Sequence, residues 1–112
     1  MSTIFVGYQI RLWGTFRPAP GEDMSDIDAV TVTAGGVAVT GVQFAAAPNA
    51  LWTQPWVAAA GIPGPATGDV LWTALWAPTV IGRTRVVSVA SVGGGAAKSA
   101  YVDFAAYHAT AP

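Results

Sequence analysis

Tryptophan is the residue type whose number and spacing in this chain could do chemistry. Four of the five tryptophans lie in two similar hexapeptides, Leu-Trp-Thr-Gln-Pro-Trp at residues 51–56 and Leu-Trp-Thr-Ala-Leu-Trp at residues 71–76. In each hexapeptide the indoles are four residues apart, which puts them on one face of a strand. Such indoles can fill a core, stack on sugar rings when exposed, or anchor a protein contact.

A second candidate is an acidic stretch, which holds four of the six acidic residues at positions 22–28. Asp23, Asp26 and Asp28 offer the carboxylate oxygens that Ca²⁺ prefers. Their spacing does not match an EF-hand loop, because the glycine and the late glutamate of that loop are missing. We therefore favour a solvated acidic loop between two strands and predict no metal site.

No recognisable catalytic motif stands out in this sequence. His108 is the single histidine, and no Gly-x-Ser-x-Gly motif accompanies it. The glycines at 93–95 are not followed by lysine in P-loop spacing. Arg83 and Arg85 share a strand face and could bind a carboxylate or phosphate, but a solvated strand edge or a contact to a neighbour is the simpler interpretation. We predict that the protein is not an enzyme and has no cofactor.

The composition favours a chain that packs against other chains. Charged residues make up 10% of the 112 residues and hydrophobic residues 53%, whereas about 25% of residues are charged in ordinary soluble domains. A net charge of −1 provides no basic field for nucleic acid. The absence of cysteine excludes disulfides and thiolate metal sites. Low charge is tolerated when surfaces are covered by neighbours.

The length predicts one domain, at residues 1–108, followed by a frayed tail at 109–112. Every apolar run is shorter than the roughly 20 residues that a membrane-spanning helix needs. No basic residue precedes the short apolar stretch near the start, so no signal peptide is expected. We predict neither a membrane segment nor export by that route.

Alternation of apolar and polar residues predicts an all-β fold. About seven strands separated by turn signals, including Gly35-Gly36, indicate an antiparallel, immunoglobulin-like β-sandwich or a small barrel. A helix at 71–76 is the competing interpretation, because residues four apart also share a helical face. The expected strands are residues 4–13, 29–33, 37–44, 51–58, 70–77, 79–92 and 98–108.

The two tryptophan strands are expected to pair as a hairpin. Folded antiparallel about Gly64, they bring Trp52 opposite Trp76. The same register brings Trp56 opposite Trp72. This face of the hairpin is predicted to close the core of the sandwich, since large aromatic side chains dominate cores and interfaces.

The other face of the predicted hairpin is also apolar, since it carries Leu51, Leu71 and Leu75. An antiparallel sheet with one solvated face should alternate apolar with polar residues, so this face needs a second cover. Pro55 cannot donate a ladder hydrogen bond, which favours an edge strand. These residues and the four tryptophans are our candidates for a protein interface or a ligand-stacking surface.

Two stretches carry a resemblance to a known group of proteins. Residues 8–16 (YQIRLWGTF), followed by residues 28–33 (DAVTVT), resemble the opening of small immunoglobulin-like domains of tailed-phage virion proteins. Residues 68–76 (GDVLWTALW) look like the glycine-led tryptophan strand of such domains. The resemblance implies a virion component, such as a capsid decoration, head fibre or tail-associated protein.

We therefore expect a non-enzymatic structural subunit of a multi-protein assembly, located in a phage virion after assembly in the host cytoplasm. Its expected partners are copies of itself and a capsid or tail protein, with neither nucleic acid nor membrane. The alternative is a carbohydrate-binding module or lectin-like receptor-binding protein that stacks glycans on its tryptophans.

Overall fold

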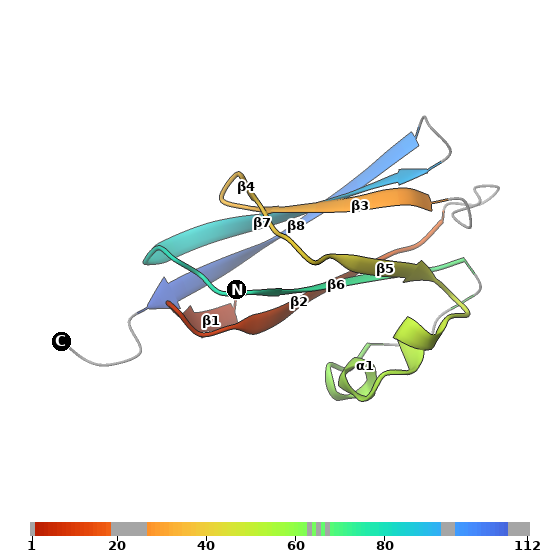
Figure 1. The fold of residues 1–112 in the computed structure, drawn as a ribbon, viewed down its shortest axis with the longest axis horizontal. Coiled ribbons are helices and arrows are strands. Elements are labelled where there is room, and N and C mark those ends of the chain that lie inside the picture. The colour runs from red at the N-terminus through yellow and green to blue at the C-terminus, as the bar shows by residue number, and fades with distance from the viewer. Residues whose placement is uncertain are drawn as a thin grey trace.

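The computed structural model describes residues 2–18, 27–62, 64, 66, 68–92 and 96–107. One sheet has five strands in the order β1-β8-β7-β3-β4, and the other has three in the order β2-β6-β5 (Figure 1). The predicted all-β sandwich is confirmed, with eight strands rather than seven and two separate sheets among the described residues. The strands are β1 Ser2–Phe5, β2 Ile10–Phe16, β3 Ile27–Ala34, β4 Val37–Ala38, β5 Gln43–Ala46, β6 Val70–Trp76, β7 Gly82–Val92 and β8 Ala96–Tyr107.

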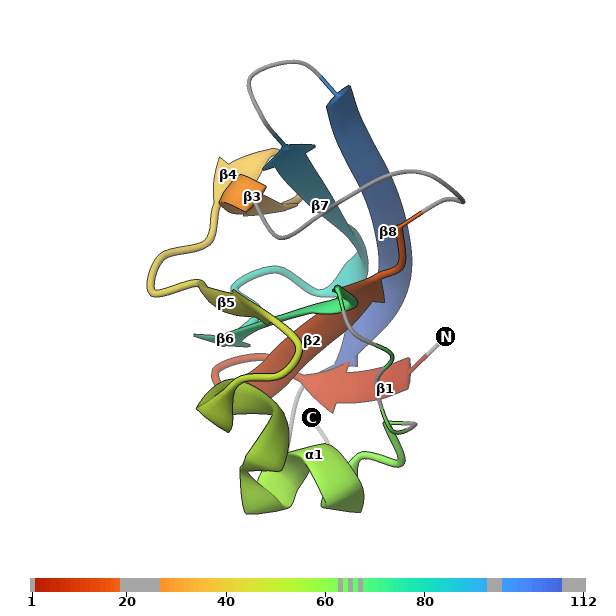
Figure 2. The same ribbon diagram turned by 90° about the vertical axis from the view of Figure 1, so that its right-hand side faces the viewer.

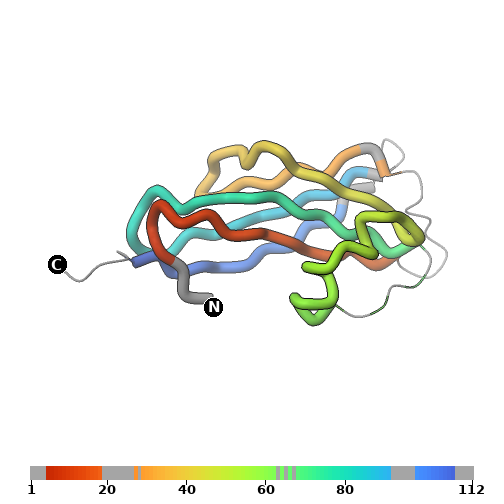
Figure 3. Tube along the Cα trace, turned by 60° about the horizontal axis from the view of Figure 1, so that its bottom comes forward, coloured from red at the N-terminus to blue at the C-terminus, as the bar shows by residue number. Residues whose placement is uncertain are grey.

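Two of the predicted strands each divide into two strands that belong to different sheets. The alternating segment 4–13 breaks at Gly7 (φ 86°), so β1 pairs in parallel with β8 whereas β2 pairs with β6. The N–H of Gly7 donates to the carbonyl of Pro78 (2.9 Å), at the end of the molecule where β6 leads into β7 (Figure 3). Segment 37–44 breaks at Gly41 (φ 73°). Because glycine accepts positive φ freely, the chain changes sheet at these points while the alternation continues.

The core between the sheets is built around Trp72, in the middle of β6. Trp72 is 3% exposed and packs in one cluster with Leu12 and Phe16 of β2 and with Val86 of β7. Its indole lies against the backbone of Gly14, its register partner. A Cβ at position 14 would lie 2.8 Å from Cε2 of Trp72 and closer still to Nε1. The core therefore needs glycine at this point of β2.

Residues 51–58 are not a strand, so this prediction is wrong. Residues Ala50–Thr53 form a 3-10 helix, η1, and residues Pro55–Ala59 form a short α-helix, α1. The side chain of Asn49 caps η1 by accepting a hydrogen bond from the N–H of Leu51 (3.0 Å). A proline leads α1, where its missing N–H removes no helical hydrogen bond. Local capping signals therefore outweigh the alternation in this segment.

The predicted tryptophan hairpin consequently does not form. β6 pairs with β2 and β5, so Trp72 lies beside Gly14 and Phe44 in register. Trp76 lies beside Ile10. Pro55 marks the start of α1 and not an edge strand. The competing helix at 71–76 is excluded as well, because these residues belong to β6.

The helical segment 50–62 packs on the outer face of the three-stranded sheet, on the side away from the five-stranded sheet (Figure 2). Leu71 projects to this side and is fully buried. The indole N–H of Trp52 donates to the carbonyl of Ala45 (3.2 Å), which ties η1 to β5. The sequence predicted that a second apolar face needs a cover, and for Leu71 the chain's own helical segment provides it. The buried cluster comprises Ala47, Leu51, Trp52, Val57, Ile62 and Leu71.

The outer face of the five-stranded sheet carries an ion pair between β7 and β8. Arg85 donates from Nε to Oδ1 of Asp103 (2.9 Å) and from Nη2 to Oδ2 (3.2 Å). The guanidinium also lies 4.0 Å from the ring centre of Tyr101. Hydrogen bonds from Arg85 hold the pKa of Asp103 below its ordinary value of 3.8. The sequence favoured a solvated strand edge or a contact to a neighbour for Arg85. Its side chain is exposed, but β7 lies inside the sheet between β8 and β3.

Asp103→Asn should make stability less dependent on pH in the acid range. A carboxylate whose pKa is lower in the folded protein stabilises the fold above the pKa of the unfolded chain, and this contribution is lost as the pH falls through the folded pKa. Urea unfolding at pH 6, 4 and 2.5 should therefore show a smaller loss of stability in the variant than in the wild type. Arg85→Gln should flatten the profile in the same way, and an unchanged profile in both variants would contradict the assignment.

Candidate functional site

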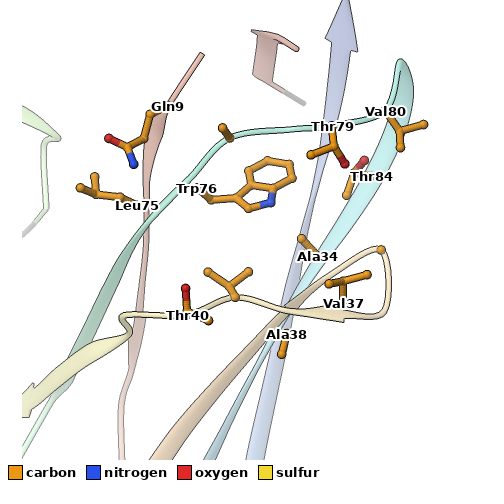
Figure 4. Close-up of a pocket in the computed structure, with 13 residues that line it drawn as sticks. Gln9, Ala34, Val37, Ala38, Thr40, Leu75, Trp76, Thr79, Val80 and Thr84 are labelled. Atoms are coloured by element: carbon orange, nitrogen blue, oxygen red, sulfur yellow. The ribbon is translucent and has the colours of Figure 1, made fainter. Parts of the chain in front are cut away.

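A pocket opens at the end of the sandwich between the β3–β4 hairpin and the connection from β6 to β7 (Figure 4). We call it the end pocket, and it encloses about 420 Å³. Gly35, in the Gly35-Gly36 turn that the sequence predicts, lines it. Its lining consists of Gln9, Ala34, Gly35, Val37, Ala38, Val39, Thr40, Leu75, Trp76, Ala77, Thr79, Val80 and Thr84.

Large apolar side chains form the wall and rim of the end pocket. The indole of Trp76 lies in the wall, and its ring centre is 6.1 Å from that of Phe104 in β8 (Figure 4). Val37 of β4 and Val80 of the connection from β6 to β7 are 70% and 66% exposed at the mouth. Leu75 is 48% exposed on the adjoining side. The end of the sandwich thus presents apolar surface to solvent.

The chemistry available in the end pocket is limited by its side chains. None of the thirteen residues that line it is charged or titrates near neutral pH. Its polar side-chain groups are the amide of Gln9, the indole N–H of Trp76 and the hydroxyls of Thr40, Thr79 and Thr84. Such a pocket can bind an apolar group and satisfy a few hydrogen bonds at the mouth, and it offers no general acid or base.

A second hollow lies on the outer face of the three-stranded sheet, beside α1. We call it the Arg11 concavity, and it encloses about 340 Å³. Arg11 donates from Nη1 to the hydroxyl of Thr73 (3.1 Å), and its guanidinium carbon lies 4.7 Å from the ring centre of Trp56. The indole N–H of Trp56 donates to Oε1 of Gln54 (2.8 Å). The residues that line it are Arg11, Gly41, Gln43, Gln54, Thr73, Ala74 and Leu75.

The structure separates the residues that the sequence grouped into one site. Trp72 is buried in the core between the two sheets. Trp52 is buried in the other cluster, under the helical segment, together with Leu51 and Leu71. Trp76 and Leu75 line the end pocket. Trp56 is half-buried beneath Arg11, and Pro55 is exposed at the start of α1. The four tryptophans thus do not form the single cluster on one hairpin face that the sequence predicted.

Several predictions fall on residues that the structure does not describe. Asp23, Asp26, His108 and the glycines at 93–95 lie outside the described residues, as does the tail at 109–112. The side chain of Asp28 is also outside the description. Among the described residues, no group of three or more histidine, cysteine, aspartate or glutamate side chains could hold a metal ion. The solvated acidic loop without a metal site therefore stays a prediction, and calcium binding stays its alternative.

Comparisons with protein-family models, curated proteins and solved structures give no match for this chain. The class established here is therefore an all-β sandwich, and the resemblance to phage virion domains stays a prediction. Within the part of the chain that the structure describes, no helix is long and apolar enough to cross a membrane.

Proposed function

We propose that this chain is a non-enzymatic structural subunit of a multi-protein assembly, and that its end pocket packs against a second copy of the chain. The observation that carries the proposal is the uncharged lining of that pocket, together with the exposed rim of Val37, Leu75 and Val80. Burying a few hundred Å² of such surface is worth several kcal/mol at about 25 cal/mol per Å², before ordering costs.

The charge of the whole chain supports the same proposal. Ten per cent of residues are charged and the net charge is −1, so copies of the chain repel one another weakly. Interface centres are depleted of charged residues, as the end pocket is. An isolated monomer would keep this apolar end in water, whereas an assembled subunit would not.

We further propose that the assembly is a tailed-phage particle, in which the chain serves as a capsid decoration, head fibre or tail-associated protein. The resemblance of residues 8–16, 28–33 and 68–76 to immunoglobulin-like virion domains supports this. A capsid or tail protein would then be the second partner. The alternative of tryptophan-stacked glycans has less support, because Trp52 and Trp72 are buried.

A charge placed on the rim should weaken association between copies. Val80→Asp puts a carboxylate at a side chain that is 66% exposed, so the fold should tolerate it while burial in a contact should not. Ala50→Asp is a matched control, because Ala50 is exposed in the first turn of η1, away from the pocket. Size-exclusion chromatography with light scattering over a range of concentrations measures the result.

We expect oligomers of the wild type and of the Ala50→Asp variant at concentrations where the Val80→Asp variant is monomeric. Unfolding by urea should show that all three proteins are folded. A wild type that stays monomeric at high concentration would contradict the proposed contact. Equal association of the Val80→Asp variant would place the contact elsewhere.

A further inference from the structure

The core-facing side of β8 is only partly covered by the three-stranded sheet. Residues directly opposite each other in β7 and β8 point to the same face of their sheet. Val86 and its register partner Val102 therefore share the core face, yet Val86 is 1% exposed and Val102 is 41% exposed. Ser88 and Ala100 repeat this contrast, since Ser88 is buried and Ala100 is exposed. The three-stranded sheet thus covers β7 and stops short of this part of β8.

The missing cover is the width of one strand. β2 is the edge strand of the three-stranded sheet on the side where β8 lies, and it pairs with β6 alone among the described strands (Figure 2). Neighbouring strands lie about 4.8 Å apart, so a fourth strand beside β2 would lie over β8. β1 borders β8 only at residues 104–107, which leaves residues 100–102 beyond its end. The outer edge of β2 carries the N–H and carbonyl groups with which such a strand would pair.

A hollow of about 120 Å³ lies between β2 and β8, and we call it the lateral groove. Its volume is slightly below the roughly 150 Å³ of an engineered cavity that holds benzene, so the groove can take one side chain of medium size. None of the residues that line it is charged, which favours an uncharged occupant. The lining consists of Trp13, Gly14, Thr15, Trp72, Val86, Ser88, Ala100, Tyr101 and Val102.

A buried hydrogen-bond donor lies unpaired at the inner side of the lateral groove. The indole nitrogen of Trp72 has no hydrogen-bond partner among the described residues, although Trp72 is 3% exposed. Of the ring atoms, Nε1 lies nearest to the place that a Cβ on Gly14 would occupy. Because Gly14 has no side chain, this edge of the indole reaches beneath β2 to the groove that both residues line. An unpaired buried N–H destabilises the free chain, and an acceptor supplied by a ligand would remove that cost.

We propose that the lateral groove binds an extended segment of a partner protein, which adds to β2 as a fourth strand. Main-chain hydrogen bonds to the edge of β2 hold the segment. Its side chains alternate between the two faces, and those that face inward are uncharged and cover Ala100 and Val102. The inward residue beside Gly14 carries a hydroxyl or amide oxygen that accepts from Nε1 of Trp72. This inference goes beyond self-association and does not depend on it, since it concerns another surface and another kind of partner.

The probe is a library of random heptapeptides, selected by ribosome display against the immobilised full chain. We expect enriched peptides in which small or apolar uncharged residues recur at every second position. The best peptide is then synthesised and titrated against the chain, with tryptophan fluorescence as the readout. Two further versions carry N-methyl groups on alternate amides, one version for each set. Because alternate N–H groups of an added strand point to β2, one version should bind at least about tenfold more weakly than the other.

Variants and NMR connect the binding to the lateral groove. Val102→Asp should weaken peptide binding by about 10- to 100-fold, because the added strand would bury a carboxylate. Ala100→Glu tests the same surface independently, and Val80→Asp, at the end pocket, is the matched control that should bind as the wild type does. All three positions are exposed, and circular dichroism checks that each variant is folded. The indole N–H signal of Trp72, assigned by its loss in Trp72→Phe, should move downfield when the peptide binds.

Several results would overturn this inference. One is a selection that yields no peptide with saturable binding at millimolar concentration. Another is equal binding of the two N-methylated versions, which would show that the peptide does not add as a strand. A third is wild-type binding by folded Val102→Asp and Ala100→Glu variants, or an indole signal of Trp72 that the bound peptide leaves unchanged. None of these results bears on self-association through the end pocket, so the two proposals can fail separately.

Discussion

Leu71→Ala is expected to lower the free energy of unfolding by about 2–5 kcal/mol, the range for truncating a fully buried leucine. Leu71 has no exposed surface, because the helical segment 50–62 packs over it. The variant leaves a cavity between β6 and Trp52, which cannot collapse freely because its indole is bonded to β5. Urea unfolding followed by circular dichroism measures the loss.

The same strand provides a matched control for this prediction. Leu75 points to the same face of β6, four residues after Leu71, but is 48% exposed. Leu75→Ala should change the unfolding free energy by no more than about 0.5 kcal/mol, as is usual for surface positions. Equal effects of the two substitutions would show that the helical segment does not cover Leu71. The two variants thus test which part of the outer face of β6 is covered by the helical segment and which part is exposed.

Gly14→Ala is expected to destabilise the fold by about 1–3 kcal/mol, the usual cost of forcing an extra methyl group into a packed core. The added Cβ would lie 2.8 Å from Cε2 of Trp72. Trp72 cannot easily move away, since it is 3% exposed and surrounded by both sheets. Chemical unfolding measures the loss, and a shift in tryptophan emission should accompany it.

Two further variants separate this clash from a general effect of replacing glycine. Gly64→Ala should be nearly neutral, because nothing lies within 4 Å of a Cβ at that position. Trp72→Phe removes the indole nitrogen, which has no hydrogen-bond partner among the described residues, and so makes room beside position 14. In the Trp72→Phe background, Gly14→Ala should therefore cost less than in the wild type. Equal costs in both backgrounds would contradict the contact.

The sequence predicts the fold correctly where the alternation of apolar and polar residues coincides with a real strand and where glycines mark a turn. The strands at 70–77, 79–92 and 98–108 were placed within a few residues, and Gly35-Gly36 was recognised as a turn. The segment at 51–58 was misread because residues four apart share a face in a helix as well as in a strand. Asn49, which caps the helical turn that follows it, was the signal that could have decided the matter.

The candidate sites were less predictable, because both depend on tertiary contacts. Trp76 and Leu75 were identified from the two similar hexapeptides, but Val37 of β4 and Val80 of the connection from β6 to β7 reach the same pocket from far apart in the sequence. Likewise, nothing local indicates that Arg11 meets Trp56. Trp56 and Trp76 hold the same position in their hexapeptides yet have different surroundings, since one lies on α1 and the other in β6.

The central claim is that the uncharged end of the sandwich is a contact between copies of the chain. Amide hydrogen exchange, measured by mass spectrometry at low and high protein concentration, tests it most directly. We expect exchange to slow at high concentration in residues 37–40 and 75–81, which frame the end pocket, and to stay unchanged in residues 50–59. Exchange that is independent of concentration in all these segments, or slowed only in residues 50–59, would contradict the account.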